Sequence, residues 1–161
     1  NCELTVGGSP PDFSAADVGV MILHGHPNSW GELVALKHGG ASIVPEELGS
    51  LVGRCGCFVL GACYGSSGST IAGSRECWGA VSSALAAGAT CVIAPCFSVH
   101  PDFLIHWIGQ FLRQLASGIP AATAADCVNR DHKTMAERTA MQVFGDGSFR
   151  LEPRTPHHSQ L

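Results

Sequence analysis

The chain has 161 residues and a mass of 16.7 kDa, which is enough for one domain with a single hydrophobic core. Apolar residues make up 45% and charged residues 14%, a balance that excludes an intrinsically disordered chain. The formal net charge is -4, so the chain has no basic field with which to bind a phosphate backbone. Its apolar runs are too short to span a bilayer. We therefore expect neither nucleic acid nor a membrane as a partner.

The sequence reads as a single unit without an internal repeat. We expect one domain over residues 1–152, followed by a polar tail over residues 153–161 that contains His157 and His158. The chain does not begin with Met, which suggests a fragment, a processed product or an isolated domain of a longer protein.

In chain order, short apolar runs rich in β-branched residues predict buried strands. The predicted strands cover residues 1–6, 18–23, 33–36, 57–62, 90–97 and 141–144, and a Gly/Pro-rich loop covers 7–12. Caps, proline and glycine positions predict helices over 45–48, 74–87, 102–116 and 120–130, the second capped by Ser74 with Glu76 in its first turn. Strands that alternate with helices favour a mostly parallel sheet covered by helices on both faces.

Eight cysteines in so short a chain raise a choice between disulfides, a metal site and buried thiols. Most of them lie inside apolar runs, as at Cys57, Cys91 and Cys96, and buried free thiols behave as small hydrophobic side chains. No C-x-x-C pair occurs, and the histidines show no zinc spacing against the cysteines. We therefore expect a reduced, cytoplasmic protein without a metal site.

Two of the predicted strands end in residues that can do chemistry. The strand over 18–23 runs into His24 and Gly25, and the strand over 57–62 runs into Cys63 and a Gly/Ser-rich turn. A histidine at such a place can act as a general base near neutral pH, and the uncrowded amide of a glycine suits an oxyanion donor. Each also has an ordinary interpretation, as a polar loop histidine and as a core cysteine.

The pair is more informative than either residue alone. Because the carboxyl ends of adjacent parallel strands lie at one edge of a sheet, we expect His24 and Cys63 to meet there. A free cysteine has a pKa of about 8.5, so an imidazole is needed as the base that forms the thiolate nucleophile. The amides of Gly25 and Cys63 would then bind the developing oxyanion. His26 is a competing base, because it faces the same side of an extended chain as His24.

These motifs, in this order, resemble the CHAT domain, a caspase-like group of cysteine peptidases related to caspases and separase. The matching stretches are 20–25, 60–65, 79–95 and 143–146, and the resemblance covers most of residues 18–147. It implies a three-layer, caspase-like α/β sandwich with a mostly parallel central sheet. It also implies a cysteine endopeptidase in which His24 is the base, Cys63 is the nucleophile, and a thioester acyl-enzyme forms without a metal or organic cofactor.

The resemblance has consequences for substrate and architecture. Residues 97–100 lie where the family has a Trp and nearby acidic residues, which marks Ser98 and Asp102 as weak candidates for substrate binding, Asp102 with a preference for Arg or Lys. The substrate would be a protein or peptide, and the domain would be fused to, or regulated by, a repeat or sensor domain. The family has further strands before the histidine strand, so we expect a sheet that is incomplete at its N-terminal edge.

Two other functions remain open. One is a catalytically silent domain of the same fold that acts as an interaction or scaffold module. The other is a small doubly wound domain of the flavodoxin type, which would bind a phosphate or flavin at the strand ends. The intact pair of His24 and Cys63 favours the peptidase over the silent domain, whereas the short segment before the histidine strand favours a silent fragment. The three tryptophans, Trp30, Trp78 and Trp107, are expected to pack in the core.

Overall fold

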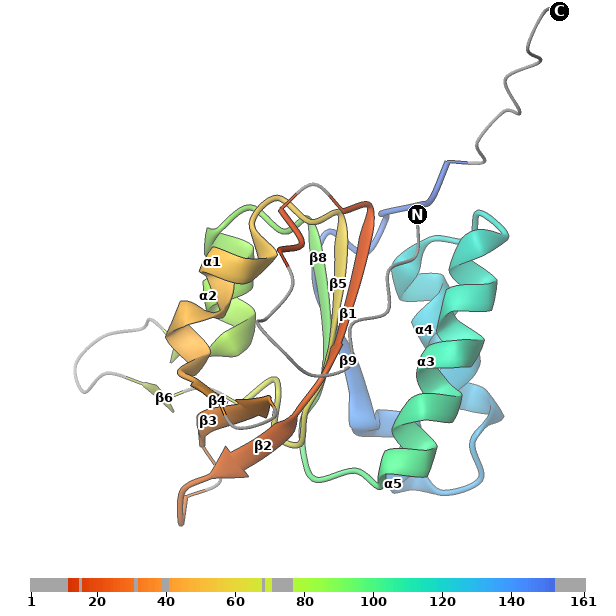
Figure 1. Ribbon diagram of the computed structural model, residues 1–161. Helices are drawn as coiled ribbons and strands as arrows, with labels where there is room; N and C mark the ends of the chain where they lie inside the picture. Colours follow the sequence, from red (N-terminus) through yellow and green to blue (C-terminus); the bar gives the residue numbers. More distant parts are fainter. Residues whose placement is uncertain are drawn as a thin grey trace, which may run out of the picture.

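The computed structural model describes residues 12–14, 16–30, 32–38, 41–67, 69–70 and 77–152. These residues form an α/β fold of three layers, with a central sheet between two layers of helices (Figure 1). The strand predicted over 1–6, nearly all of the loop over 7–12 and the tail from 153 onward lie outside the described residues.

The central sheet has four strands in the order β1-β5-β8-β9. β1 (Val18–Ile22), β5 (Cys57–Gly61) and β8 (Cys91–Pro95) run parallel, and β9 (Met141–Gly145) runs antiparallel to β8. β5 and β8 are buried along their whole length, because helices cover both faces of the sheet. The prediction of a mostly parallel sheet with helices on both faces is confirmed.

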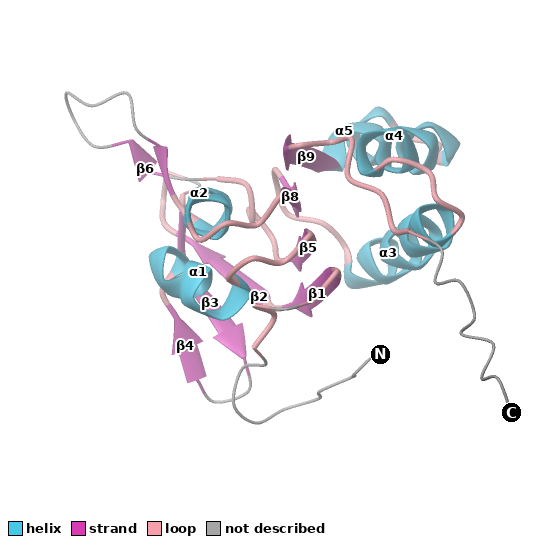
Figure 2. Cartoon of the chain, turned by 90° about the horizontal axis from the view of Figure 1, so that it is seen from above, coloured by secondary structure: helices cyan, strands magenta, loops and turns pink. Residues whose placement is uncertain are grey.

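Helices cover both faces of the sheet (Figure 2). α1 (Leu48–Val52) and α2 (Ala80–Ala86) lie on one face, whereas α3 (Pro101–Ala116) and α4 (Ala121–Asp131) lie on the other. None of the helices in the described part of the chain has both the length and the apolar composition that crossing a membrane requires.

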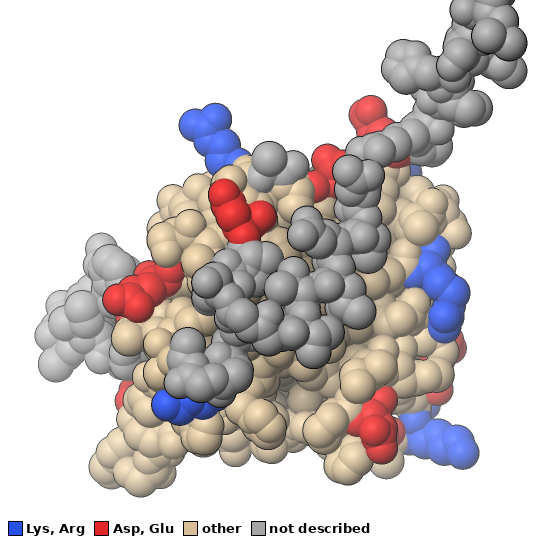
Figure 3. All heavy atoms as spheres, in the orientation of Figure 1, with Lys and Arg blue, Asp and Glu red and all other residues tan. Residues whose placement is uncertain are grey.

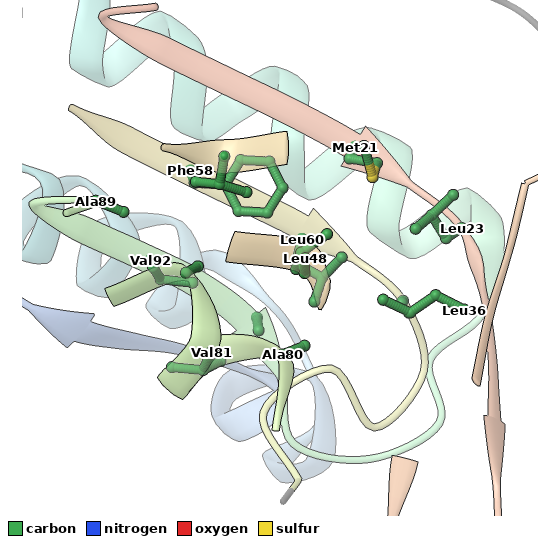
Figure 4. Close-up of a cluster of buried hydrophobic side chains, with 14 of the residues drawn as sticks. Met21, Leu23, Leu36, Leu48, Phe58, Leu60, Ala80, Val81, Ala89 and Val92 are labelled. Atoms are coloured by element: carbon green, nitrogen blue, oxygen red, sulfur yellow. The ribbon is translucent and has the colours of Figure 1, made fainter. Parts of the chain in front are cut away.

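Each face of the sheet has its own hydrophobic core. Because side chains alternate along a strand, Phe58 of β5 packs toward α1 and α2, near Leu48 (Figure 4), while its neighbour Val59 packs on the opposite side. There Val59 joins Trp107 and Phe111 of α3, whose rings stack with their centroids 5.2 Å apart. The expectation that Trp107 lies in the core is confirmed.

Two small antiparallel sheets lie outside the central one. β2 (His24–Pro27), β3 (Leu33–His38) and β4 (Ala41–Ile43) form the first, and β6 (Ser69–Thr70) with β7 (Cys77–Trp78) forms the second. β2 follows β1 after a single residue, so the chain leaves the central sheet directly into the β2–β4 sheet.

Two short helical segments complete the fold. η1 (Pro45–Glu47) is a 3-10 turn that leads into α1, and α5 (Met135–Ala140) leads into β9. α5 begins with a capping box, in which Thr134 and Glu137 each bind the other's backbone N–H group.

Some of the sequence predictions are wrong. The helix predicted over 74–87 begins only at Ala80, because residues 77–78 form β7; Ser74 and Glu76 lie outside the described residues. The sequence predicts that the chain leaves the strand conformation at His24, but residues 24–27 form strand β2, because they pair with β3. Trp30 is 87% exposed at the turn between β2 and β3 rather than buried in the core. The side chain of Trp78 is outside the described part.

Candidate active site

The carboxyl ends of the three parallel strands lie along one edge of the central sheet, at the bottom of Figure 1. The pairing of β1 with β5 continues past the strands, since the Leu23 N–H donates to the Gly61 carbonyl at 2.9 Å. Cys63 follows β5, and Ser98 follows β8. This edge therefore gathers residues that are far apart in the sequence.

Gly25 lies directly against the backbone of Cys63. A Cβ atom built on Gly25 would stand 2.0 Å from the Cys63 carbonyl oxygen, whereas real Cβ contacts are essentially never shorter than 3.0 Å. Only a residue without a side chain fits between β2 and the turn after β5. The structure thus brings the segment of His24 and Gly25 into contact with the segment of Cys63.

The Cys63 thiol is half-buried and has two polar neighbours in the turn after β8. The Ser98 hydroxyl donates to Sγ at 3.5 Å, and Sγ lies 3.7 Å from the Val99 carbonyl oxygen, to which the thiol donates. The Ser98 hydroxyl and the Val99 carbonyl thus hold the sulfur atom against the turn after β8.

The turn that contains Cys63 is held tightly to the turn after β8. Tyr64 donates its backbone N–H to the Phe97 carbonyl at 3.3 Å, and Ser66 donates to the Pro95 carbonyl at 3.0 Å. Tyr64 has a φ of 59°, a strained conformation for a bulky residue that is found most often at functional sites. The Cys63 N–H donates no backbone hydrogen bond to any residue within the described ranges, which leaves this donor for an oxyanion.

The two histidines of β2 are exposed, and their ring centroids are 6.5 Å apart. Since alternate residues of a strand face the same side, His24 and His26 share one face of β2, and Gly25 meets Cys63 on the other. No hydrogen bond joins either ring to Cys63 in the part of the chain that the structure describes. The structure thus brings the backbones of the two segments together, but not the His24 ring and the Cys63 thiol.

A third imidazole, that of His100, lies next to the residues that contact the thiol. His100 follows Val99 and caps α3, because its Nδ1 accepts from the Asp102 N–H at 3.3 Å. The same Nδ1 is 3.6 Å from the Asp102 carboxylate, and the two side chains are 75% and 90% exposed. Its place directly before Pro101 is the signal in the sequence for a helix cap. Asp102 thus lies in solvent beside His100.

The other described cysteines, which are Cys55, Cys57, Cys91, Cys96 and Cys127, are free thiols. Burial raises the pKa of Cys55 to about 11. A hydrogen bond with Cys91, together with burial, raises the pKa of Cys57 far above its ordinary value. Burial also raises the pKa of Cys96. These three thiols stay protonated at neutral pH, which makes them poor nucleophiles.

A hollow of about 250 Å³ on the described surface does not include Cys63; its lining includes His106, His132 and Glu137. No group of three or more His, Cys, Asp or Glu side chains that could hold a metal ion occurs among the described residues. On the face shown in Figure 3, basic and acidic side chains are interspersed and do not form a patch of one sign.

The chain was compared with models of known protein families and with curated proteins. No family model matches it, and no curated protein matches it.

Proposed function

We propose that this chain is a caspase-like cysteine endopeptidase domain that hydrolyses a peptide bond of a partner protein through Cys63. The observation that carries the proposal is the close approach of Gly25 to the Cys63 backbone at the carboxyl edge of a mostly parallel sheet. It supports a site in which a thiol and two candidate oxyanion donors share one rim. The resemblance to the CHAT domain supplies the role of His24 as the base.

The chemistry proceeds in two steps. His24 takes the thiol proton, Cys63 Sγ attacks the scissile carbonyl carbon, and the amides of Gly25 and Cys63 bind the resulting oxyanion. The protonated His24 gives its proton to the leaving amine, which leaves a thioester on Cys63. Water, deprotonated by His24, then hydrolyses the thioester and releases the acid.

The sheet topology is compatible with this assignment. The strands that lead to His24 and Cys63 are adjacent and parallel, and the last strand, β9, is antiparallel at the far end. β1 stands at the other end of the strand order.

The second candidate is a catalytically silent domain of the same fold that acts as an interaction module. One observation favours it: within the described ranges, no imidazole is hydrogen-bonded to Cys63. Such a domain would hold Cys63 for packing, and replacement of any nearby histidine would leave the reactivity of the thiol unchanged.

Alkylation by iodoacetamide at pH 7, followed for each cysteine by mass spectrometry, tests the proposal. Cys63 is expected to react fastest among the thiols, because in the proposal a base assists it. Cys55, Cys57 and Cys91 are fully buried, and burial raises the pKa of Cys96. His24→Ala is expected to slow Cys63 roughly tenfold or more, because general-base assistance is lost.

His26→Ala and His100→Ala are the matched controls, since both replace a neighbouring exposed imidazole. They are expected to leave the rate at Cys63 within about twofold of that of the unmodified sequence. If only the His26 replacement, or only the His100 replacement, slowed the alkylation of Cys63, that histidine would be the base instead of His24. An unchanged rate in all three variants would establish the silent domain.

A further inference from the structure

A hollow of about 150 Å³ opens between the turn after β8 and helix α5. Most of its wall is apolar. The apolar side chains that line it are those of Phe97, Val99, Phe103, Ala136 and Ala140. A cavity of this composition favours an apolar occupant, because burial of apolar surface drives binding and an unpaired charge would lose its hydration there.

The hollow adjoins the candidate nucleophile through two residues. Ser98 and Val99 both line it, and both contact the Cys63 sulfur, at 3.5 and 3.7 Å. A peptide that presents its carbonyl carbon to Cys63 Sγ therefore has an adjacent side chain beside the entrance of the hollow. The hollow is therefore adjacent to the candidate nucleophile.

The polar residues that line the hollow are Ser98, His100 and Glu137. Glu137 is the one acidic residue of its wall, and Glu137 Oε2 accepts from the Thr134 N–H at 3.2 Å and from the Thr134 hydroxyl at 2.9 Å. Asp102 is 90% exposed beside His100 and is not part of the wall. Of the two carboxylates that could recognise Arg or Lys, that of Glu137 is thus hydrogen-bonded within the capping box of α5, and that of Asp102 lies in solvent.

We propose that this hollow binds an uncharged apolar side chain of the substrate, about the size of leucine or methionine, and thereby sets the preference of Cys63 for its cleavage site. The inference rests on the proposed function and names its substrate class. It replaces the preference for Arg or Lys that Asp102 would have given.

Three peptidyl acyloxymethyl ketones that differ only in the side chain beside the ketone test the proposal. The side chains are norleucine, arginine and aspartate. In each reaction the Cys63 thiolate displaces the acyloxy group, which leaves as a carboxylate, and a bond forms between Sγ and the methylene carbon. The norleucine reagent is expected to alkylate Cys63 roughly tenfold or more faster than the other two, the scale on which apolar pockets discriminate.

Variants of α5 test whether the hollow causes the preference for the norleucine reagent. Ala136 is exposed and lines the hollow, so Ala136→Trp fills it without disturbing the core, and is expected to reduce the norleucine rate roughly tenfold. Met135→Trp is the matched control, because Met135 is 76% exposed and does not line the hollow. It is expected to behave like the original chain. Met135→Trp should also leave the rate with iodoacetamide unchanged, because that reagent carries no side chain.

The outcomes separate this inference from the proposed function. Three equal rates, with Cys63 still reacting fastest and in a His24-dependent way, would overturn the pocket and leave the peptidase proposal intact. A fastest reaction with the arginine reagent, lost in Glu137→Gln, would show that the hollow recognises a cation through Glu137 and would also overturn the inference. Failure of Cys63 to react ahead of the other thiols would overturn both.

Discussion

Gly25 is the residue on which the approach of the two strand ends depends most directly. Its missing side chain gives room to the Cys63 carbonyl oxygen, and the same backbone segment carries His24 and the proposed oxyanion donor. Any larger residue must push β2 away from the turn after β5. The geometry of the candidate site and the stability of the β2–β4 sheet are therefore linked at this position.

We predict that Gly25→Ala destabilises the protein by about 1–3 kcal/mol, the usual cost of an extra methyl group in a filled space. It should also slow alkylation of Cys63, because the turn moves. Chemical denaturation and mass-spectrometric alkylation measure the two effects.

Gly109→Ala is the control for Gly25→Ala. Gly109 lies inside α3, and a Cβ atom there would meet nothing within 4 Å. Alanine at a helical position is expected to stabilise the protein by about 0.5–1 kcal/mol relative to glycine, with no change at Cys63. A Gly25→Ala variant as stable and as reactive as the original chain would contradict the contact that the structure shows.

At the scale of elements, α5 begins with a carboxylate that makes its stability depend on pH. Hydrogen bonds from the Thr134 hydroxyl and N–H hold the pKa of Glu137 below its ordinary value. A carboxyl group with a lowered pKa stabilises the folded state at pH values above its unfolded pKa of about 4.3. That contribution is lost as the pH falls through the lowered value.

We predict that Glu137→Gln is less stable than the original chain at pH 7 and that the difference disappears toward pH 3. Glutamine keeps the hydrogen bonds of a capping box but not the charge, so the variant isolates the ionised carboxylate. Thermal unfolding across this pH range measures the difference. A gap in stability that is the same at pH 7 and pH 3 would show that the charge of Glu137 contributes nothing.

The success of sequence reasoning differs between elements for physical reasons. β5 and β8 are continuous apolar runs buried on both faces, and such runs predict central strands within one or two residues. β1 is a similar apolar run at the end of the strand order, although only alternate residues of it are buried. β2 has no such pattern, since His24–Pro27 becomes a strand only by pairing with β3. The capping box of α5, Thr134 with Glu137, was present in the sequence as a signal for a helix start, and it could have predicted that helix.

At the scale of the whole molecule, the layered arrangement positions the candidate site. Two independent cores fix the parallel strands from both faces, so their carboxyl ends form a rigid rim from which only turns project. Turns on such a rim are where α/β proteins usually place their functional residues. The sheet thereby brings the segments of Gly25, Cys63 and Ser98 together.

Only part of the candidate site could be predicted from the sequence. The meeting of the segments around His24 and Cys63 follows from two parallel strands that end at one edge, so the sequence could predict it. The hollow beside Ser98 also needs Ala136 and Glu137, which reach the rim only because α5 folds back before β9. No local pattern encodes this distant contact, and so neither residue was a sequence candidate.

The most direct test of the central claim is a crystal structure of the protein after reaction with the norleucine ketone. The account predicts a bond from Cys63 Sγ to the reagent, and a ketone oxygen within hydrogen-bond distance of the Gly25 and Cys63 N–H groups. It also predicts a ring nitrogen of His24 within about 3.2 Å of the reacting atoms. An adduct on another cysteine, or a His24 ring that stays on the far face of β2, would contradict it.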